Sequence, residues 1–449
     1  MRVVVVSESF LPTTNGVTTS VRKVLDHLAA EGHEAIVIVP TAGAPATYAG
    51  FRVHEVPAIA YRQFPVGLPH PMVQKLIADF KPDVVHAASP FLLGAQAIAA
   101  AGRLGIASVA IFQTDVAGYA RRNRLGAATR FAWRIVRWIH EGADLTLVPS
   151  SASMADLEGA GVQRLARWGR GVDLDTYHPR NRTAPGVRRL RERLAPHGET
   201  IVGYVGRLAP EKQVERMSAL RGLSGIRLAL VGSGPSLGSI KRELSGMPVT
   251  YLGPLSGPDL AAAYASFDVF LHTGTEETFG QTVQEAHASG LPVVAPRAGG
   301  PIDLIDHGTT GYLYDPEDAA TLRPYVEALT IDPELRSRMG EAGRRGVLGK
   351  TWHGVCSDLV GYYEPAIASR VRCSMGRRTS ACTPLMKARP VGNAYLSSSV
   401  TDSSAFRIDS GSGAFMAGVL LRAAAKGRAQ APCRLVAVGL ARVESVRRV

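Results

Sequence analysis

MRVVVVSESFLPTTNGVTTSVRKVLDHLAAEGHEAIVIVP, residues 1–40, contains one complete β-loop-α-β unit. The run RVVVV (2–6) is apolar and β-branched throughout, as in a strand buried on both faces. Apolar residues then recur at helical spacing from Val17 to Leu28, and Gly32 marks the end of that helix. EAIVIVP follows as a second strand. Such units build parallel sheets with helices on their faces.

The same alternation continues along most of the chain. PDVVHA, SVAIFQT and DLTLVPS extend the first strand series to about residue 150. A second series starts at TIVGYVGRL and continues through RLALVG, VTYLG, DVFLHTG and PVVAP. We therefore predict an α/β protein with two doubly wound, Rossmann-like domains. The predicted parts are a first domain (1–172), a linker (173–199), a second domain (200–350), a helix (351–371) and a basic tail of low order (372–449).

The basic charge of the chain is concentrated in that tail. The net charge is +13, and residues 372–449 hold 13 basic and 3 acidic residues, which leaves +3 for the rest. Three of the four cysteines also lie there, and no CxxC pair indicates a zinc ribbon. The tail is either a disordered extension attracted to anionic lipid or the product of a frameshift. We assign no catalytic residue to it.

Two loops after predicted strands carry groups suited to an anion. Asn15-Gly16 precedes a helix, and glycine lets backbone N–H groups approach a phosphate there, although a turn alone also explains it. GRLAPEK (206–212) places Arg207 and Lys212 around a proline turn. Two cations at a strand end suit a diphosphate, and the alternative is a solvated charged loop.

GTEETFGQTVQEAHASG, residues 274–290, holds two glutamates around a Phe-Gly step. The N–H groups at Phe279, Gly280 and Gln281 are expected to face an anion from a helix N-terminus. Glu285, one turn further, can accept two hydrogen bonds from a vicinal diol such as a ribose. Glu277, on the loop, is placed to contact another part of the same ligand. The alternative is a helix-start acid and an exposed helical acid.

Together these motifs resemble a known family. E-x7-E with an internal FG, GRxxxxK, the N-terminal glycine loop and RGVDLDTYHP are similar to the GT-B glycosyltransferases of family 4 over roughly residues 1–368. The likeness is greatest to actinobacterial GDP-mannose-dependent α-mannosyltransferases that modify glycolipids. It implies a retaining transfer of mannose from GDP-mannose to a lipid or glycolipid acceptor, and an acceptor domain followed by a nucleotide-sugar domain. The helix at 351–371 would then cross back to the first domain.

The resemblance also implies a role for each site residue. Glu285 would hold the nucleotide ribose, and Glu277 would lie near the donor sugar. Arg207 and Lys212 would neutralise the diphosphate. The backbone at Gly16 and at the three residues from Phe279 to Gln281 would assist them.

Enzymes of this kind have no agreed protein nucleophile, and the resemblance implies a front-side attack in which the leaving phosphate takes the acceptor proton. No cofactor and no metal is predicted, since the DLD triplet (173–175) falls in the linker. Where many relatives carry histidine, this chain has IFQTD. Glutamine cannot act as a base, so we expect Gln113 to orient the sugar or acceptor. Asp115 is the better candidate for binding the acceptor hydroxyl, unless it only caps a helix.

The segment GYARRNRLGAATRFAWRIVRWIH (118–140) is basic and aromatic, and predicts a helix. Ala128, Phe131, Ile135, Trp138 and Ile139 share one face, which we expect to pack on a sheet. A membrane-surface helix is the alternative, and no nucleic-acid motif accompanies the segment. No apolar run reaches the ~18 residues of a spanning helix. We therefore expect a cytoplasmic protein, with a peripheral position on the inner membrane face left open.

Other functions stay open at this point. A UDP-sugar donor with transfer of galactose, glucose or sulfoquinovose is the main alternative within the class. A sugar-nucleotide epimerase shares the architecture but needs an acid/base pair that the sequence does not offer. A glycoside hydrolase would use two carboxylates but not Arg207 and Lys212. A sugar-nucleotide sensor would bind the donor without turnover.

Overall fold

The structure is a computed structural model. Its described residues are 1–13, 15–61, 64–68, 70–113 and 126–376, and all of them belong to one compact unit. Residues 377–449, which make up most of the predicted tail, lie outside the described part.

The first half of the chain forms an eight-stranded sheet in the order β10-β9-β8-β7-β1-β2-β4-β3, parallel except for β3. β1 is central: Val4 pairs with Ile36 of β2 on one side and with Val85 of β7 on the other. The strands are β1 (Arg2–Ser7), β2 (Glu34–Pro40), β3 (Thr47–Tyr48), β4 (Phe51–Val56), β7 (Val84–Ala88), β8 (Ala107–Ile111), β9 (Leu145–Val148) and β10 (Leu165–Arg167). A separate hairpin pairs β5 (Ala58–Tyr61) with β6 (Phe64–Gly67).

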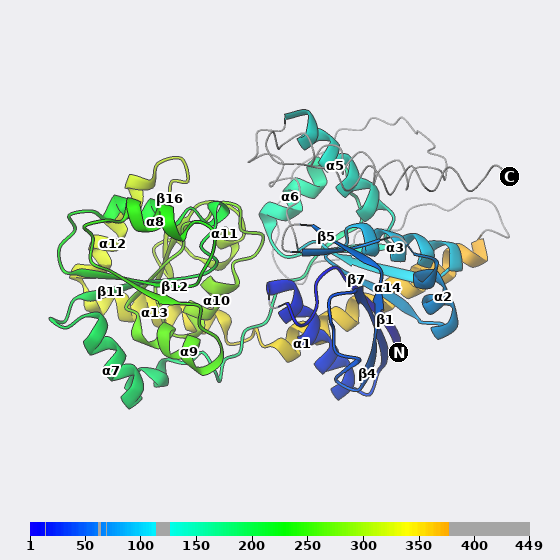
Figure 1. The fold of residues 1–449 in the computed structure, drawn as a ribbon, viewed down its shortest axis with the longest axis horizontal. Helices are drawn as coiled ribbons and strands as arrows, with labels where there is room; N and C mark the ends of the chain where they lie inside the picture. Colours follow the sequence, from blue (N-terminus) through cyan, green and yellow to red (C-terminus); the bar gives the residue numbers. More distant parts are fainter. Residues whose placement is uncertain (14, 62–63, 69, 114–125, 377–449) are drawn as a thin grey trace. The chain divides into compact units, whose positions relative to one another are not determined.

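Helices cover this sheet (Figure 1). They are α1 (Gly16–Ala30), α2 (Pro71–Phe80), α3 (Leu92–Leu104), α5 (Gly126–Glu141) and α6 (Ser151–Gly159). The Asn15 side chain caps α1 by accepting a hydrogen bond from the Thr18 amide at 2.9 Å, so the chain turns into α1 directly after the loop that follows β1.

The second half forms a six-stranded, fully parallel sheet in the order β13-β12-β11-β14-β15-β16. Its strands are β11 (Thr200–Val205), β12 (Ile226–Val231), β13 (Val249–Gly253), β14 (Val269–Leu271), β15 (Val293–Pro296) and β16 (Gly311–Tyr314). The helices are α7 (Pro185–Leu194), α8 (Leu237–Glu243), α9 (Gly257–Ser266), α10 (Gln281–Ala288), α11 (Pro301–Leu304), α12 (Leu322–Ile331) and α13 (Pro333–Val347). Short 3₁₀ turns are η1 (Pro179–Thr183), η2 (Pro210–Lys212), η3 (Val214–Leu220) and η4 (Ala319–Thr321).

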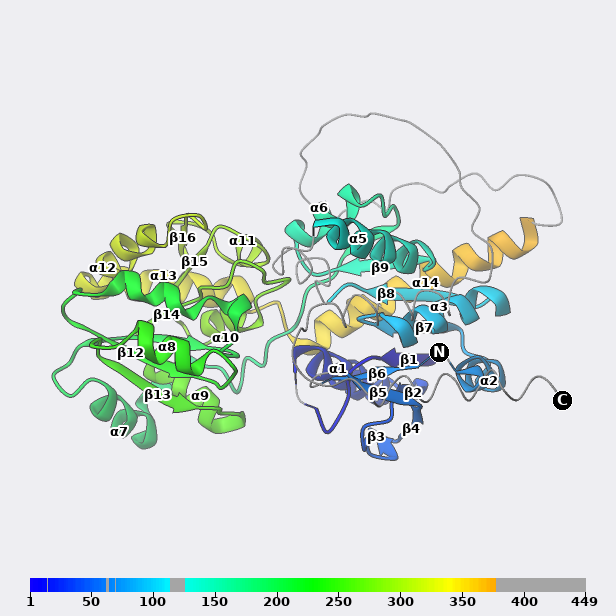
Figure 2. The ribbon, with the colours of Figure 1, turned by 45° about the horizontal axis from the view of Figure 1, so that its top comes forward.

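The last helix, α14 (Trp352–Gly376), packs on the first sheet although it follows the second one in sequence. Figure 2 shows it beside β8. Leu359 and Tyr363 are fully buried in the same cluster as Val5 of β1 and Leu25 of α1. The Tyr363 hydroxyl lies 2.7 Å from Nδ1 of His86. The helix therefore completes the core of the first sheet.

The chain crosses between the two sheets twice, and the two connections run side by side. Val172 pairs with Thr351 in a parallel bridge, and its amide donates to the Lys350 carbonyl at 2.8 Å. A Cβ atom at Gly171 would lie 2.5 Å from the Trp352 Cα, so only glycine allows this close approach. The segments before residue 173 and after residue 349 thus form one joint.

The predicted fold class is confirmed by these two parallel sheets, whereas the exact domain bounds stay a prediction. The expected packing of the helix around residues 118–140 is confirmed for Ile135 and Ile139, which are buried. It is wrong for Trp138, whose exposed fraction is 51%, because the packed face turns toward Val136 instead. Residues 118–125 lie outside the described part. Among the described helices, none has the length and apolarity to cross a membrane.

Candidate active site

The loop between β14 and α10 carries Glu277 and is held by glycines from a neighbouring turn. The Glu277 carbonyl accepts a hydrogen bond from the Gly300 amide at 2.6 Å. Gly299 has a φ of +62°, and a Cβ atom there would lie 2.4 Å from the Glu277 carbonyl oxygen. The turn can therefore fix the position of Glu277 only because residues 299 and 300 have no side chains.

Glu277 forms an ion pair with Lys212, which comes from the end of η2. Their side chains are 19% and 24% exposed. Burial acts to raise the pKa of Glu277, but the charges of Lys212, His272 and Arg170 outweigh it and lower that pKa to about 2. The carboxylate is therefore ionised at neutral pH.

The loop GRLAPEK lies beneath the glycine loop after β12. The Leu208 amide donates to the Ser233 carbonyl at 2.9 Å, and a Cβ atom at Gly234 would lie 2.2 Å from the Leu208 carbonyl oxygen. Arg207, on this loop, is exposed and lies 3.7 Å from a carboxylate oxygen of Glu211. The structure thus places Arg207 and Lys212 on one loop, but each has its own carboxylate partner.

Glu285 lies one turn into α10, in different surroundings. Its carboxylate accepts a hydrogen bond from the Tyr264 hydroxyl at 2.9 Å. Burial raises the pKa of Glu285 to about 7, although hydrogen bonds from Tyr264 and Gln281 oppose the shift. This carboxyl group therefore binds a proton at a much higher pH than an ordinary glutamate does.

The N-terminus of α10 has the geometry expected of an anion site. Gly280 precedes the helix with a φ of +101°, which favours glycine. Phe279 is buried, and the described residues offer no recorded acceptor for the backbone N–H of Gly280 or of Gln281. The Gln281 side chain donates to the Gly171 carbonyl at 3.1 Å, which joins α10 to the connection between the sheets.

Arg170 links this region to the first sheet. It is 9% exposed, and its guanidinium donates to Oε1 of Gln113 at 2.7 Å. A Cβ atom at Gly16 would lie 2.7 Å from its Nη1 atom, so the guanidinium fills the space that a side chain at the start of α1 would need. Burial lowers the pKa of Arg170, and the charge of Glu277 opposes that shift.

Two further hydrogen bonds hold the E-x7-E segment against the first half of the chain. The Thr278 hydroxyl donates to the Gln113 carbonyl at 3.4 Å, and the Gln284 side chain donates to the Arg170 carbonyl at 3.0 Å. The loop with Glu277 therefore contacts the segment after β8, and α10 contacts the segment after β10. Polar groups from both sheets meet in one place.

Comparisons with known proteins agree with this geometry. Residues 14–176 match the model of Glycosyltransferase Family 4, and residues 188–346 match that of Glycosyl transferases group 1. The chain is 46% identical over 378 residues to a GDP-mannose-dependent alpha-mannosyltransferase of Mycolicibacterium smegmatis, which covers 82% of this chain and 99% of the relative. The chain belongs to glycosyltransferase family 4.

Two more distant proteins are also similar to this chain. A sulfoquinovosyl transferase of Arabidopsis thaliana is 36% identical over 342 residues, which are 73% of this family 4 chain and 66% of the plant protein. The solved structure of a sucrose-phosphate synthase from Thermosynechococcus elongatus superposes with a TM-score of 0.69 at 21% identity, over 82% of this chain and 99% of that one. This structural likeness supports the GT-B fold.

Sequence reasoning missed two residues of this family 4 site. Arg170 stands inside the motif RGVDLDTYHP, where an arginine between Gly169 and Gly171 was the available signal. His272 directly follows β14 and is buried, with no hydrogen bond from either ring nitrogen to the described residues. Burial lowers the pKa of His272 to about 4, against the opposing charge of Glu277. The ring is therefore neutral at pH 7 and carries a charge only in the acidic range in which Glu277 titrates.

The remaining predicted residues divide between described and undescribed parts. Asp115 lies outside the described residues. Asp173, the first acid of the DLD triplet, accepts hydrogen bonds from the Thr176 amide at 3.0 Å and the Thr176 hydroxyl at 2.8 Å. Burial acts to raise the pKa of Asp173, but these hydrogen bonds and one from the Asp175 amide lower it. Asp173 thus caps its own turn.

Proposed function

We propose that this family 4 glycosyltransferase transfers a mannosyl residue from GDP-mannose to a lipid-linked acceptor, with retention of configuration. The observation that carries the proposal is the 46% identity to a GDP-mannose-dependent alpha-mannosyltransferase over 99% of that protein's length. A match of that extent includes 82% of this chain.

The proposed donor site lies on the second sheet. Lys212 and Arg207 neutralise the diphosphate, together with backbone N–H groups at Gly280 and Gln281. An ammonium has three N–H donors, so Lys212 can keep its contact with Glu277 and still bind a phosphate oxygen. Glu285 binds the ribose hydroxyls. Preorganised positive charge of this kind stabilises the departing nucleoside diphosphate without reorganisation during the reaction.

Arg170 and Gln113 form the part of the proposed site that faces the donor sugar. Gln113 accepts from the Arg170 guanidinium, so its role is to position that cation rather than to act as a base. The charge of Glu277 acts to raise the pKa of Arg170, so the two side chains are close. In this proposal Glu277 faces the donor sugar. Asp115 and the backbone at Gly16 and Phe279 keep their predicted roles in binding the acceptor hydroxyl and the phosphates.

The lipid part of the acceptor rests on the surface of α5. Trp138 is 51% exposed on this helix, and Arg134 and Arg137 are exposed beside it. An aromatic ring among arginines is suited to the boundary between lipid headgroups and acyl chains. We propose that the enzyme acts at the inner membrane face, and that it needs no divalent metal because protein cations supply the charge.

The test begins with the donor. Binding of GDP, UDP and ADP to the full chain is measured by calorimetry in the presence of EDTA. Turnover of GDP-mannose is then measured with a diacylglycerol-based glycolipid in anionic vesicles and with a water-soluble glycoside. The proposal expects GDP to bind most tightly and the vesicle substrate to be preferred. A need for added metal, or preference for the soluble acceptor, contradicts the corresponding part.

A UDP-sugar donor is the second candidate, because the plant sulfoquinovosyl transferase is 36% identical over 342 residues. Tighter binding of UDP than GDP would favour it. A sugar-nucleotide epimerase predicts isomerisation of the donor with no acceptor present. A sensor predicts binding with no turnover under any of these conditions.

A further inference from the structure

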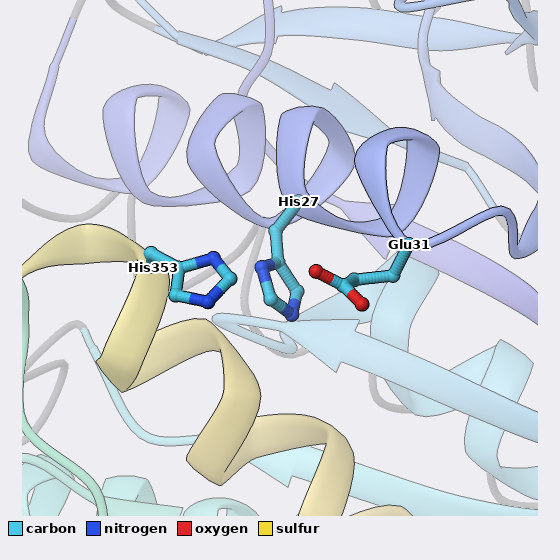
Figure 3. A group of neighbouring side chains, drawn as sticks. All are labelled: His27, Glu31 and His353. Carbon is cyan, nitrogen blue, oxygen red and sulfur yellow. The ribbon is translucent and has the colours of Figure 1, made fainter.

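Three metal-ligating side chains meet where α1 ends and α14 begins, away from the active site. His27 and Glu31 are four residues apart, so they lie on the same side of α1 at its end. His353 belongs to the first turn of α14. Figure 3 shows the His27 ring between the His353 ring and the Glu31 carboxylate, with both pointing toward it. The cluster lies about three helical turns along α1 from Gly16.

The geometry of this trio suits a metal ion. Each side chain offers one ligand atom, and these atoms all lie within 4.8 Å of one another. The ring centroids of His27 and His353 are 5.1 Å apart. None of the three side chains has a recorded hydrogen bond or ion pair with another described residue. His27 is buried and fixed, whereas Glu31 and His353 are exposed and can move to close the site.

Burial lowers the pKa of His27, and the neighbouring His353 lowers it further, with Glu31 opposing. A neutral imidazole is the form that binds metals.

We propose that His27, Glu31 and His353 bind one divalent transition-metal ion of the zinc class, with water as the remaining ligand. Two imidazoles and one carboxylate are a common set for zinc, at about 2.0–2.2 Å from the ion. Oxygen-only ligands would suit Mg²⁺ or Ca²⁺ instead, so the two nitrogen donors select the metal. Four-coordinate ligands at that distance are about 3.4 Å apart, so the ligand atoms must approach one another by up to about 1.4 Å when the ion binds.

The position of the site gives the ion a structural role. His353 follows the joint where Val172 pairs with Thr351, and α1 begins at Gly16, which contacts Arg170. Cys356 of α14 already lies 3.6 Å from the Lys23 carbonyl of α1 through its Sγ atom. A bound ion would add a cross-link between α1 and α14 directly beside the joint. It would fix α14 to the first sheet without contacting the donor.

The test uses the full chain without a polyhistidine tag. Accessible cysteines are first alkylated, because Cys373, Cys382 and Cys433 are alternative zinc ligands. The metal-free protein is titrated with Zn²⁺ in competition with a chromophoric chelator, and with Co²⁺ while visible absorption is recorded. We expect one equivalent of tight zinc, cobalt bands typical of four-coordinate geometry, and a rise in Tm of a few degrees with zinc.

Matched variants separate this site from adventitious binding. His353→Ala and Glu31→Gln change exposed side chains, so both should fold and bind GDP as the wild type does. Each should lose at least tenfold in zinc affinity, together with the cobalt bands and the zinc-dependent rise in Tm. His197→Ala, which removes another exposed histidine, should change none of these. Zinc binding of equal affinity in His353→Ala and the wild type, or no tight equivalent in the wild type, overturns the proposal.

Discussion

The loop that carries Glu277 and the helical turn that carries Glu285 are eight residues apart, yet they give the same side chain opposite acidities. At Glu277, burial is outweighed by Lys212, His272 and Arg170, and the pKa is lowered to about 2. At Glu285, burial dominates over the hydrogen bond from Tyr264, and the pKa is raised to about 7. The difference comes from the neighbours, because Glu277 on loop 274–280 faces cations and Glu285 in α10 faces a tyrosine.

This contrast separates two tasks within one motif. A permanently ionised carboxylate keeps neighbouring cations in place and stabilises charge while a bond breaks. A carboxyl group with a pKa near 7 has both a donor and an acceptor form near neutral pH, which suits hydrogen bonding to hydroxyl groups. We therefore expect Glu277 to govern turnover and Glu285 to govern donor affinity.

The largest effect is expected from Glu277→Gln. The change leaves Lys212 and Arg170 without their counter-charge, so the cations reorient or bind the diphosphate without the correct geometry. We expect kcat with GDP-mannose to fall by ~10²-fold or more, with a small change in KM. Steady-state kinetics checks this. Glu317→Gln, which removes the same charge from an exposed loop position, is the control and should keep wild-type kcat.

Glu285→Ala should show the opposite pattern. Loss of the ribose contact removes binding energy that is equal in the ground state and the transition state, so KM should rise and kcat should change little. We expect GDP affinity, measured by calorimetry, to fall about tenfold. Should Glu285→Ala and Glu277→Gln reduce kcat equally, the division of tasks is wrong and the motif acts as one unit.

The sequence predicts the strand-end positions of these residues because a parallel sheet brings the carboxyl ends of its strands to one edge. Lys212 after β11, and Glu277 after β14, follow directly from the strand pattern, since β11 and β14 are neighbours in the sheet. Glu285 follows from helical spacing alone. These local rules reach only residues that lie in a regular, strongly patterned element or in the loop that follows one.

Arg170 could not be predicted in the same way. It lies in the connection between the sheets, where no periodicity fixes its direction, and its contact with Gly16 spans 154 positions of the sequence. The pKa values of the two glutamates could not be predicted from the sequence either. They depend on burial and on neighbouring groups such as His272, which only the folded chain brings together. The short strand β10 (Leu165–Arg167) also lacks a pattern of its own and forms by pairing with β9.

The pH dependence of stability should separate the two glutamates in sign. The unfolded pKa of each is 4.5. Because the folded pKa of Glu277 is lower, its contribution is present above pH 4.5 and is lost as pH falls toward 2. Because the folded pKa of Glu285 is higher, its contribution is present below pH 4.5 and is lost as pH rises toward 7.

Urea unfolding midpoints of the wild type, Glu277→Gln and Glu285→Gln between pH 4 and 8 measure this difference. The wild-type advantage over Glu277→Gln should shrink toward pH 4, and the advantage over Glu285→Gln should shrink toward pH 7. Burial also raises the pKa of Glu8 to about 7, but this effect is common to all three proteins and cancels in the comparison. Parallel pH profiles for the two variants would contradict the assigned acidities.

The smallest expected effect tests the neighbour rather than the glutamate. Tyr264→Phe removes one hydroxyl that donates to Glu285 at 2.9 Å, and it keeps the buried ring. Because that hydrogen bond lowers the pKa of Glu285, its loss should raise this pKa further and leave the carboxyl group less well oriented. A hydrogen bond of about 1 kcal/mol corresponds to a loss of about fivefold in GDP affinity at pH 7, with kcat unchanged.

Tyr362→Phe removes a hydroxyl that donates to the Arg167 carbonyl at 2.9 Å and serves as the matched control. Equal GDP affinities for the two variants would mean that Tyr264 only packs against Glu285 and does not set its acidity.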